Sequence, residues 1–345
     1  MNVSALSSNA LYAKSKAMNA KRITERQYAD MAALPDIGEL ASYLKNRTSY
    51  SAAFEGIGGV SFNRARLEGV IKRMIFLREQ TIMRYAELTG SGLGDYFTAR
   101  RETDIIISCA RRNGETFSVD PYLLYLPDSA KQSLRIDLSG IEDVKSDTQM
   151  LEALEGTPYH KLLTGVLSGD RRHFVNMQNI LYKNLFEQTA KNLESHLSGE
   201  DAAKAVGILS ELSDIITLSS LYRIKKYYPD DEKMIFHVFR ANVTKLDKKC
   251  FDELCAAKDA AEVEKLINNG KYGKYFRDNY DSRNLSRRIM YTACKKHLSA
   301  SFSAVVSAIC CDELFRIEAT NLSTVAEGIS YKMSPDEIMS LLIKE

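Results

Sequence analysis

The side chains that most often carry enzyme chemistry form no known catalytic or metal-binding pattern in this chain of 345 residues. No two of its five histidines have the HExxH spacing that places zinc ligands on one helix face. No two of its six cysteines have CxxC spacing. Lone histidines on helices are usually structural or solvated, and scattered cysteines are typical of buried, reduced thiols in a cytosolic protein. The histidines are His160, His173, His196, His237 and His297, and the cysteines are Cys109, Cys250, Cys255, Cys294, Cys310 and Cys311.

The glycines of the segment FEGIGGVSF at 54–62 only superficially suggest a phosphate-binding loop. The segment lacks the Gly-Lys-Ser/Thr ending and no convincing strand precedes it, so we expect a turn before a helix. The chain also contains no GxSxG nucleophile motif. The sequence therefore predicts no catalytic residue, no cofactor and no metal ligand, and a protein that is not itself an enzyme.

Three tyrosines follow similar helical segments at nearly equal distances along the chain. An apolar pair on one predicted helix face precedes each of Tyr50, Tyr159 and Tyr272. The gaps are 159 − 50 = 109 and 272 − 159 = 113 residues, so three units of one kind would fill the chain. A threefold repeat of helical units suggests a shaped scaffold, whereas an enzyme usually needs one asymmetric pocket. The apolar pairs are Leu40 and Leu44, Leu151 and Leu154, and Val263 and Leu266.

A second mark, an acid or amide followed by an aliphatic residue, recurs at nearly the same period. Asp104, Asp214 and Asn321 are separated by 214 − 104 = 110 and 321 − 214 = 107 residues. Each follows a glutamate by two or three positions: Glu102, Glu211 and Glu318. Two interpretations are open. These side chains fix one helix against its neighbours by hydrogen bonds, or they make a repeated contact with a partner.

Most of the sequence is predicted to be helical, and we expect an all-α fold. Six prolines and 18 glycines interrupt the chain rarely, as long helices require. Thr24 with Gln27, and Asp36 with Glu39, have the spacing of helix-starting capping residues. Ser334 followed by Pro335 predicts another helix start near the C-terminus. Long helices are expected at about 62–88, 95–112, 173–196 and 282–296.

Two polar breaks divide the predicted helices into three helical lobes, at residues 1–118, 119–231 and 232–345. The first break runs from about 113 to 120 and is followed by the segment DPYLLYLPDS, which contains two prolines. The second is the proline-bearing turn YYPDDE. Each lobe then contains one copy of both repeated marks.

The net charge and the hydropathy of the chain limit the classes of partner that we expect it to bind. The net charge of +2 offers little attraction for nucleic acid. The N-terminus has no signal-peptide core, and the apolar stretch at 302–311 is too short for a bilayer span of ~20 residues. We therefore expect no nucleic-acid binding and no direct membrane insertion. A candidate partner-contact surface is the arginine-rich segment with Arg100, Arg101, Arg111 and Arg112, where reversal to glutamate would test for weakened assembly.

Three segments resemble a known family. The opening LYAKSKAMNAKRITERQYADM (11–31) resembles the start of the C-type subunit of V-type (A-type) ATP synthases. This subunit is the counterpart of the d-type subunit of the vacuolar ATPase. The matching residues are Tyr12, Lys14, Lys16, Ala17, Met18, Arg22, Thr24 and Tyr28. The segment 96–112 is similar to an internal family element, with Asp104 where asparagine is usual. The segment 312–342 is similar to the closing element, with Glu318, Asn321 and Ile338 in place but without the usual arginine after Asn321.

The resemblance implies three similar lobes arranged as a funnel around a central opening. It implies a non-catalytic rotor subunit, cytoplasmic and peripheral to the membrane, present as one copy per complex. Its partners would be the central shaft and the membrane proteolipid ring, between which it would transmit torque for proton or sodium ion transport. The alternative from another class is a soluble helical adaptor that binds partner helices and has no ATPase attached.

Overall fold

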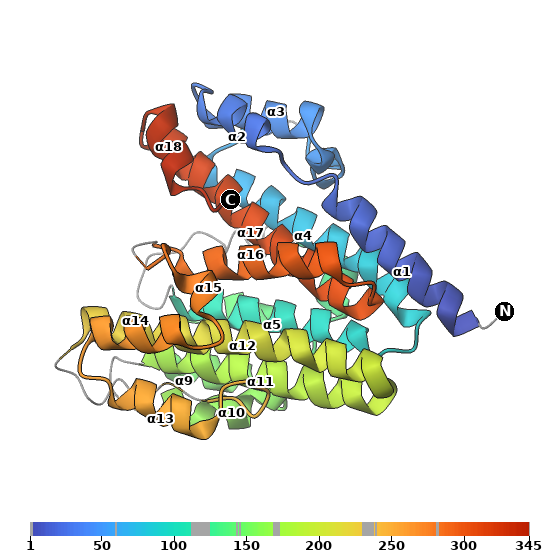
Figure 1. Cartoon of the computed structure of the whole chain (residues 1–345). Coiled ribbons are helices and arrows are strands. Elements are labelled where there is room, and N and C mark those ends of the chain that lie inside the picture. The colour runs from blue at the N-terminus through green and yellow to red at the C-terminus, as the bar shows by residue number, and fades with distance from the viewer. Residues whose placement is uncertain are drawn as a thin grey trace. The chain divides into compact units, whose positions relative to one another are not determined.

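The structure is a computed structural model, and it contains helices and no strand in the residues that it describes. This confirms the predicted all-α class (Figure 1). The described residues are 3–58, 61–111, 125–142, 144, 146–167, 173–229, 238, 240–280 and 283–344.

The chain divides into two compact units. Unit 1 comprises Met1–Thr89, Thr116–Leu134 and Cys294–Glu345, and unit 2 comprises Gly90–Glu115 and Arg135–Ala293. Both breaks expected from the sequence, near 118 and 231, lie outside the described residues. The division into three lobes at 1–118, 119–231 and 232–345, and their arrangement as a funnel, therefore stay predictions.

Unit 1 is built on three long helices that pack on one another. α1 (Val3–Asn19) and α4 (Arg64–Glu87) both pack against α17 (Ala304–Ser330). Shorter helices cover one end of this group, and α17 contacts three of them. These shorter elements are α2 (Glu25–Ala32), α3 (Ile37–Arg47), η1 (Ser49–Phe54) and α18 (Pro335–Leu341); α7 (Asp128–Gln132) also belongs to unit 1.

The short helices of unit 1 begin where the sequence predicts. The Thr24 hydroxyl accepts from the Gln27 amide and the Gln27 side chain accepts from the Thr24 amide, which completes a capping box. Asp36 accepts from the Glu39 amide at the start of α3. At α18, Ser334 caps a helix with proline in its first turn. These caps satisfy first-turn amides that have no partner within the helix.

Unit 2 also has three long helices at its centre. α11 (His173–His196) packs against both α5 (Leu93–Arg111) and α12 (Gly199–Tyr227). Short helices surround these three: α8 (Leu138–Glu142), α9 (Asp147–Ala153), α10 (Pro158–Leu167), α13 (Lys248–Ala256), α14 (Ala260–Asn269) and α15 (Gly273–Phe276). α16 (Leu285–Ala300) contributes its first nine residues to this unit.

α12 is the one helix in the described part of the chain that has the length and composition to cross a membrane. However, 78% of its most apolar window is buried inside the protein. Two acids in this helix, Glu211 and Asp214, are also buried and have partners from the segment that precedes α13. α12 is therefore packed as a core helix of unit 2.

Candidate functional site

The two repeated marks meet in the structure, because each tyrosine donates its hydroxyl proton to a buried acid. Tyr50 donates to Glu318 at 3.0 Å. Tyr159 donates to Glu102 at 2.7 Å. Tyr272 donates to Asp214 at 2.5 Å. We call these pairs anchor 1, anchor 2 and anchor 3; all six side chains are at most 3% exposed.

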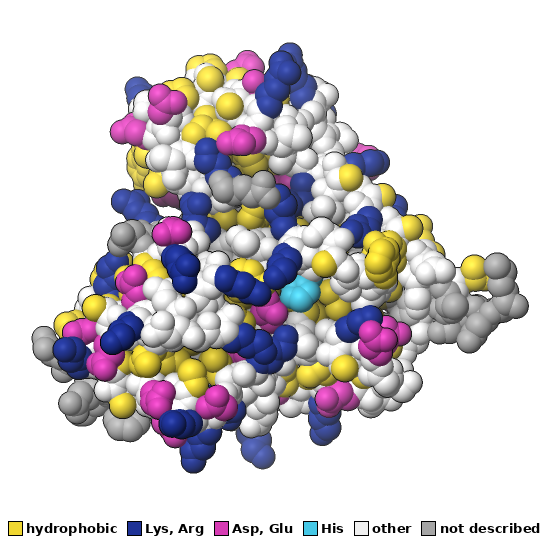
Figure 2. Space-filling model, viewed as in Figure 1, with side chains coloured by type: hydrophobic (Ala, Val, Ile, Leu, Met, Phe, Trp, Pro, Cys, Tyr) yellow, Lys and Arg dark blue, Asp and Glu magenta, His cyan; other side chains and the backbone are white. Residues whose placement is uncertain are grey.

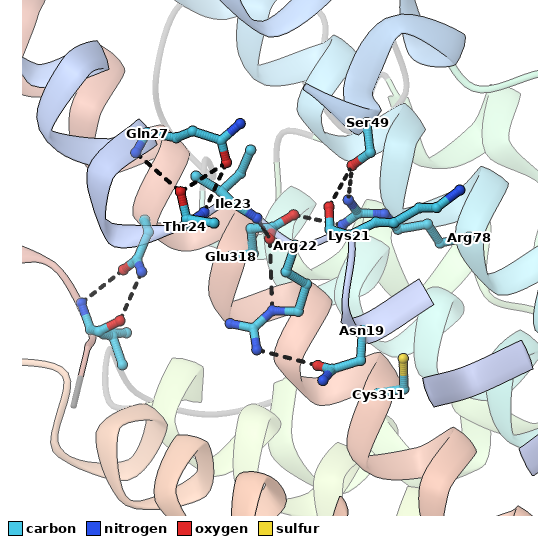
Figure 3. A network of polar contacts seen from close by, with 12 residues as sticks. Asn19, Lys21, Arg22, Ile23, Thr24, Gln27, Ser49, Arg78, Cys311 and Glu318 are labelled. Carbon is cyan, nitrogen blue, oxygen red and sulfur yellow. Dashed lines mark hydrogen bonds and ion pairs between the residues drawn. The ribbon is translucent and has the colours of Figure 1, made fainter. Parts of the chain in front are cut away.

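Anchor 1 lies in unit 1 and centres on Glu318 of α17 (Figure 3). The backbone amide of Ile23 donates to Glu318 Oε2 at 2.7 Å, and the Arg78 guanidinium donates to Oε1 at 2.7 Å. Arg22 Nε lies 3.7 Å from Oε2. Arg78 also lies over the ring of Tyr50, with its Cζ 4.9 Å from the ring centroid. One carboxylate therefore fixes the segment before α2, the start of η1 and α4 against α17.

Anchor 2 lies in unit 2 and centres on Glu102 of α5. The backbone amide of Arg135 donates to Glu102 Oε1 at 2.5 Å, and its guanidinium donates to Oε2 at 2.6 Å. Tyr159 of α10 supplies the third donor. The charge-assisted hydrogen bonds hold the segment before α8 and the start of α10 on α5.

Anchor 3, also in unit 2, divides the same contacts between two acids on α12. Asp214 accepts from the Tyr272 hydroxyl, the Thr244 hydroxyl and the backbone amide of Lys245, the last at 2.8 Å. The Lys245 ammonium lies 3.5 Å from Glu211 instead. The two acids are three residues apart and so lie on one helix face.

A third repeated pattern, which was not predicted from the sequence, supplies the backbone donors. It is a basic residue, a buried aliphatic residue and a capping residue in succession. The basic residues are spaced by 135 − 22 = 113 and 245 − 135 = 110 residues, close to the period of the other marks. In all three copies the basic side chain lies near a buried glutamate of a long helix, which in anchor 3 is Glu211. The copies are Arg22-Ile23-Thr24, Arg135-Ile136-Asp137 and Lys245-Leu246-Asp247.

The pKa shifts of the anchor tyrosines favour a structural role for these residues over a catalytic one. Burial, and then the charge of Glu318, raises the pKa of Tyr50 well above its ordinary value. Burial and the neighbouring acid likewise raise the pKa of Tyr159 and of Tyr272. Burial also raises the pKa of Asp214, although its hydrogen bonds act in the opposite direction. These tyrosines hold their protons as hydrogen-bond donors, which suits a fixed contact and not a general base.

This arrangement predicts a loss of stability at alkaline pH. The tyrosine pKa is about 10 in the unfolded chain and higher in the folded one, so the unfolded state loses protons first as pH rises. Stability contributed by each tyrosine is complete below pH ~10 and falls by about 1.4 kcal/mol per pH unit above it. Urea unfolding between pH 8 and 12 should show a shallower decline for Tyr159→Phe than for the unchanged protein.

Tyr228→Phe is the control for this titration, because Tyr228 is 54% exposed. It should leave the alkaline slope unchanged. Equal slopes for Tyr159→Phe and the unchanged protein would show that the Tyr159 hydroxyl does not retain its proton in the folded state.

The second mark itself has three different environments. Asp214 belongs to anchor 3, whereas Asn321 bonds the backbone of Ile343 in both directions at 2.8 Å and holds the C-terminal segment on α17. Asp104 lies 3.8 Å from Arg100 on its own helix. A role shared by Asp104, Asp214 and Asn321 stays a prediction. In anchors 1 and 2 the acceptor is the preceding glutamate.

Two of the four candidate interface arginines are buried. Arg100 is 6% exposed and lies over the Tyr182 ring at 5.1 Å, and Arg101 is 1% exposed. The side chain of Arg111 and all of Arg112 lie outside the described residues. A partner surface formed by these four stays a prediction, and the burial of the first two weighs against direct contact. Glutamate at Arg101 would put a carboxylate in the core, so the reversal would lower stability as well as assembly.

Catalytic and metal-binding constellations were not predicted, and no group of three or more His, Cys, Asp or Glu able to hold a metal ion occurs within the described ranges. His160 and His196 lie on α10 and α11, and His297 lies near the end of α16. His237 and the side chain of His173 lie outside those ranges. The hydrogen bonds of the anchors themselves hold long helices to segments from elsewhere in the chain.

Comparison with known proteins identifies one family. A family model described as ATP synthase (C/AC39) subunit matches residues 11–341. No curated protein matches the chain by sequence.

Proposed function

Because the chain belongs to the ATP synthase (C/AC39) subunit family, we propose that it is a non-catalytic central-stalk subunit of a V-type ATP synthase or ATPase. In this role it is a socket between the central shaft and the membrane proteolipid ring. It transmits torque between ATP turnover in the soluble head and ion movement in the membrane. The observation that carries the proposal is the family match, which covers 341 − 11 + 1 = 331 of 345 residues.

The anchors supply a physical basis for torque transmission. A rotor part must resist deformation, and close-packed helices do so because protein interiors have low compressibility. Each anchor joins a long central helix to segments that are distant in the sequence, by 268, 57 and 58 residues between tyrosine and acid. Breaking a buried charged pair is strongly unfavourable, so the anchors favour a stiff subunit.

The surface fits a subunit that meets several partners. Charged side chains of both signs are interspersed on the face shown in Figure 2. The near-neutral total charge of +2 is compatible with a spacer between other proteins. We place the subunit at the cytoplasmic side of the membrane, peripheral to it, in one copy per complex.

A pull-down with the purified central-shaft subunit tests this role. The immobilised chain should retain the cognate shaft and should not retain an unrelated helical protein of similar size and charge. If the immobilised chain does not retain the cognate shaft, the socket role is contradicted. Retention of helical proteins outside the ATPase, with no shaft, would favour the adaptor alternative instead.

A further inference from the structure

Unit 2 contains a cavity of about 160 Å³ between the end of α12 and the start of α16. Its inner side is aromatic, because Tyr222 and Tyr280 are buried with ring centroids 4.7 Å apart. Tyr280 also bonds the side chain of Asn268 at 3.0 Å, which fixes this ring on α14. The remaining lining residues are Arg223, Tyr227, Arg283 and Leu285.

The outer side of the cavity is cationic. Arg223 and Arg283 are exposed, and neither has an ion pair within the described residues. Among those same residues, no acid lines the cavity. Lys226 lies beside it, with its ammonium 5.4 Å from the Tyr222 ring centroid.

The adjoining helix start adds to this positive field. The first turn of α16 contains no acid, and Arg287 and Arg288 follow within that turn. Helix N-termini carry partial positive charge, so an anion close to this turn is stabilised by the helix as well as by the arginines. Figure 2 shows Lys and Arg side chains (dark blue) over the part of this face where α16 lies in Figure 1.

We propose that this cavity binds an acidic segment of a partner protein, with a carboxylate between Arg223 and Arg283 and a neighbouring apolar side chain against Tyr222 and Tyr227. Arginine binds carboxylates through two parallel hydrogen bonds. Tyrosine and arginine are among the residues that are enriched where binding energy is concentrated at protein interfaces. The volume is below the ~300 to 1,000 Å³ of small-molecule sites, which favours a side chain over a cofactor.

Charge complementarity selects the partner. A cavity lined by two exposed arginines attracts an acidic surface and repels a basic one. The inference rests on the proposed function only in expecting a partner subunit of the ATPase. An acidic segment of any protein would fit the same chemistry.

A single tryptophan provides a direct reporter of binding. The chain contains no tryptophan, and Tyr227 is 61% exposed, so Tyr227→Trp places one fluorophore at the cavity. The probe is the acidic peptide acetyl-Glu-Glu-Phe-Glu-Glu-amide, with the corresponding lysine peptide as its control. The acidic peptide should change the fluorescence in a saturable manner, at least tenfold more tightly than the lysine peptide, and added salt should weaken it.

Charge-reversal variants on this background separate the cavity from the total charge. Arg223→Glu with Arg283→Glu should weaken the acidic peptide at least tenfold. Lys161→Glu with Lys191→Glu changes the net charge equally, at exposed positions of α10 and α11, and should leave binding within twofold. Equal weakening by both pairs would overturn the proposal. The proposal would also be overturned if inorganic phosphate, or vesicles of phosphatidylserine and phosphatidylcholine, saturated the fluorescence change at concentrations where the acidic peptide does not bind.

Assembly from purified ATPase subunits distinguishes this inference from the proposed function. If the unchanged chain assembles with its partners, the variant with Arg223→Glu and Arg283→Glu should assemble at least tenfold less. Its melting temperature should equal that of the variant with Lys161→Glu and Lys191→Glu. Full assembly of the reversed variant would overturn the inference and leave the socket role standing. If the unchanged chain binds no ATPase subunit, the socket role fails, and the peptide titration still decides the inference.

Discussion

Replacement of Glu318 by glutamine is expected to lower the free energy of unfolding by about 3–5 kcal/mol, the cost of removing one partner of a buried ion pair. Glu318 is 0% exposed and Arg78 is 4% exposed. Burial alone would lower the pKa of Arg78, but the Glu318 charge reverses this and keeps it above its ordinary value. Because an arginine guanidinium is not deprotonated in proteins, Arg78 stays charged in the variant, now without its carboxylate partner.

Glu327→Gln is the matched control, because it changes the same residue type on the same helix. The Glu327 side chain is 49% exposed and lies 3.6 Å from Arg64, so its loss should cost no more than ~1 kcal/mol. Urea unfolding of both variants at pH 7 measures the difference. Equal small losses would show that anchor 1 does not stabilise unit 1.

A second variant removes both charges of this pair. Arg78→Met combined with Glu318→Gln should be more stable than Glu318→Gln alone, since it leaves no uncompensated buried cation. Additive losses from the two substitutions would contradict a direct coupling between Arg78 and Glu318.

Alanine at Gly273 is expected to lower the free energy of unfolding by about 3 kcal/mol, at the upper end of the range for overpacking. A Cβ atom there would lie 2.2 Å from the backbone oxygen of Asn268. Backbone atoms at the end of α14 cannot move aside as a side-chain tip could. Because Gly273 follows Tyr272, the displacement would also disturb the hydrogen bond to Asp214 in anchor 3.

Gly165→Ala is the control for this substitution in the same unit. Gly165 is an exposed residue inside α10, and nothing lies within 4 Å of an added Cβ. Alanine is a better helix former than glycine, so this variant should gain about 0.5–1 kcal/mol. Urea unfolding with opposite signs for the two variants is the expected result; an unchanged Gly273→Ala protein would contradict the close approach.

Local structure is what the sequence predicts best in this protein. Capping residues and apolar periodicity depend on neighbours within a few positions, so α2, α11 and α18 begin at the predicted residues. Residues 133–140, with the sequence SLRIDLSG, form no strand, and α8 begins inside this segment at Leu138. Its Asp137 accepts hydrogen bonds from Ser139, a local contact that favours a helix start.

The anchors were visible in the sequence only as separate marks. Their pairing depends on packing between segments far apart in the chain, as with Tyr50 and Glu318. The near-equal offsets of 57 and 58 residues in the other two anchors are a signal that could have linked them. In anchor 3 the acceptor is Asp214, whereas the other two anchors use a glutamate. This difference obscured the equivalence of the three anchors in the sequence.

Charge density did not indicate exposure. Arg100 and Arg101 lie in a run of charged residues, which is usually a solvated helix face. Both are buried, and Arg100 lies against the Tyr182 ring of α11, which packs on α5. A helix position is solvated or buried according to its neighbours, and those neighbours come from elsewhere in the chain.

ATP-driven ion uptake into vesicles is the most direct test of the socket role. Complexes of the ATPase would be reconstituted with and without this subunit, and ATP hydrolysis and ion uptake would be measured on the same vesicles. Without the subunit, hydrolysis by the head should continue while uptake is lost, and adding the purified chain should restore uptake. Equal uptake with and without the subunit would contradict a role in transmitting torque to the ring.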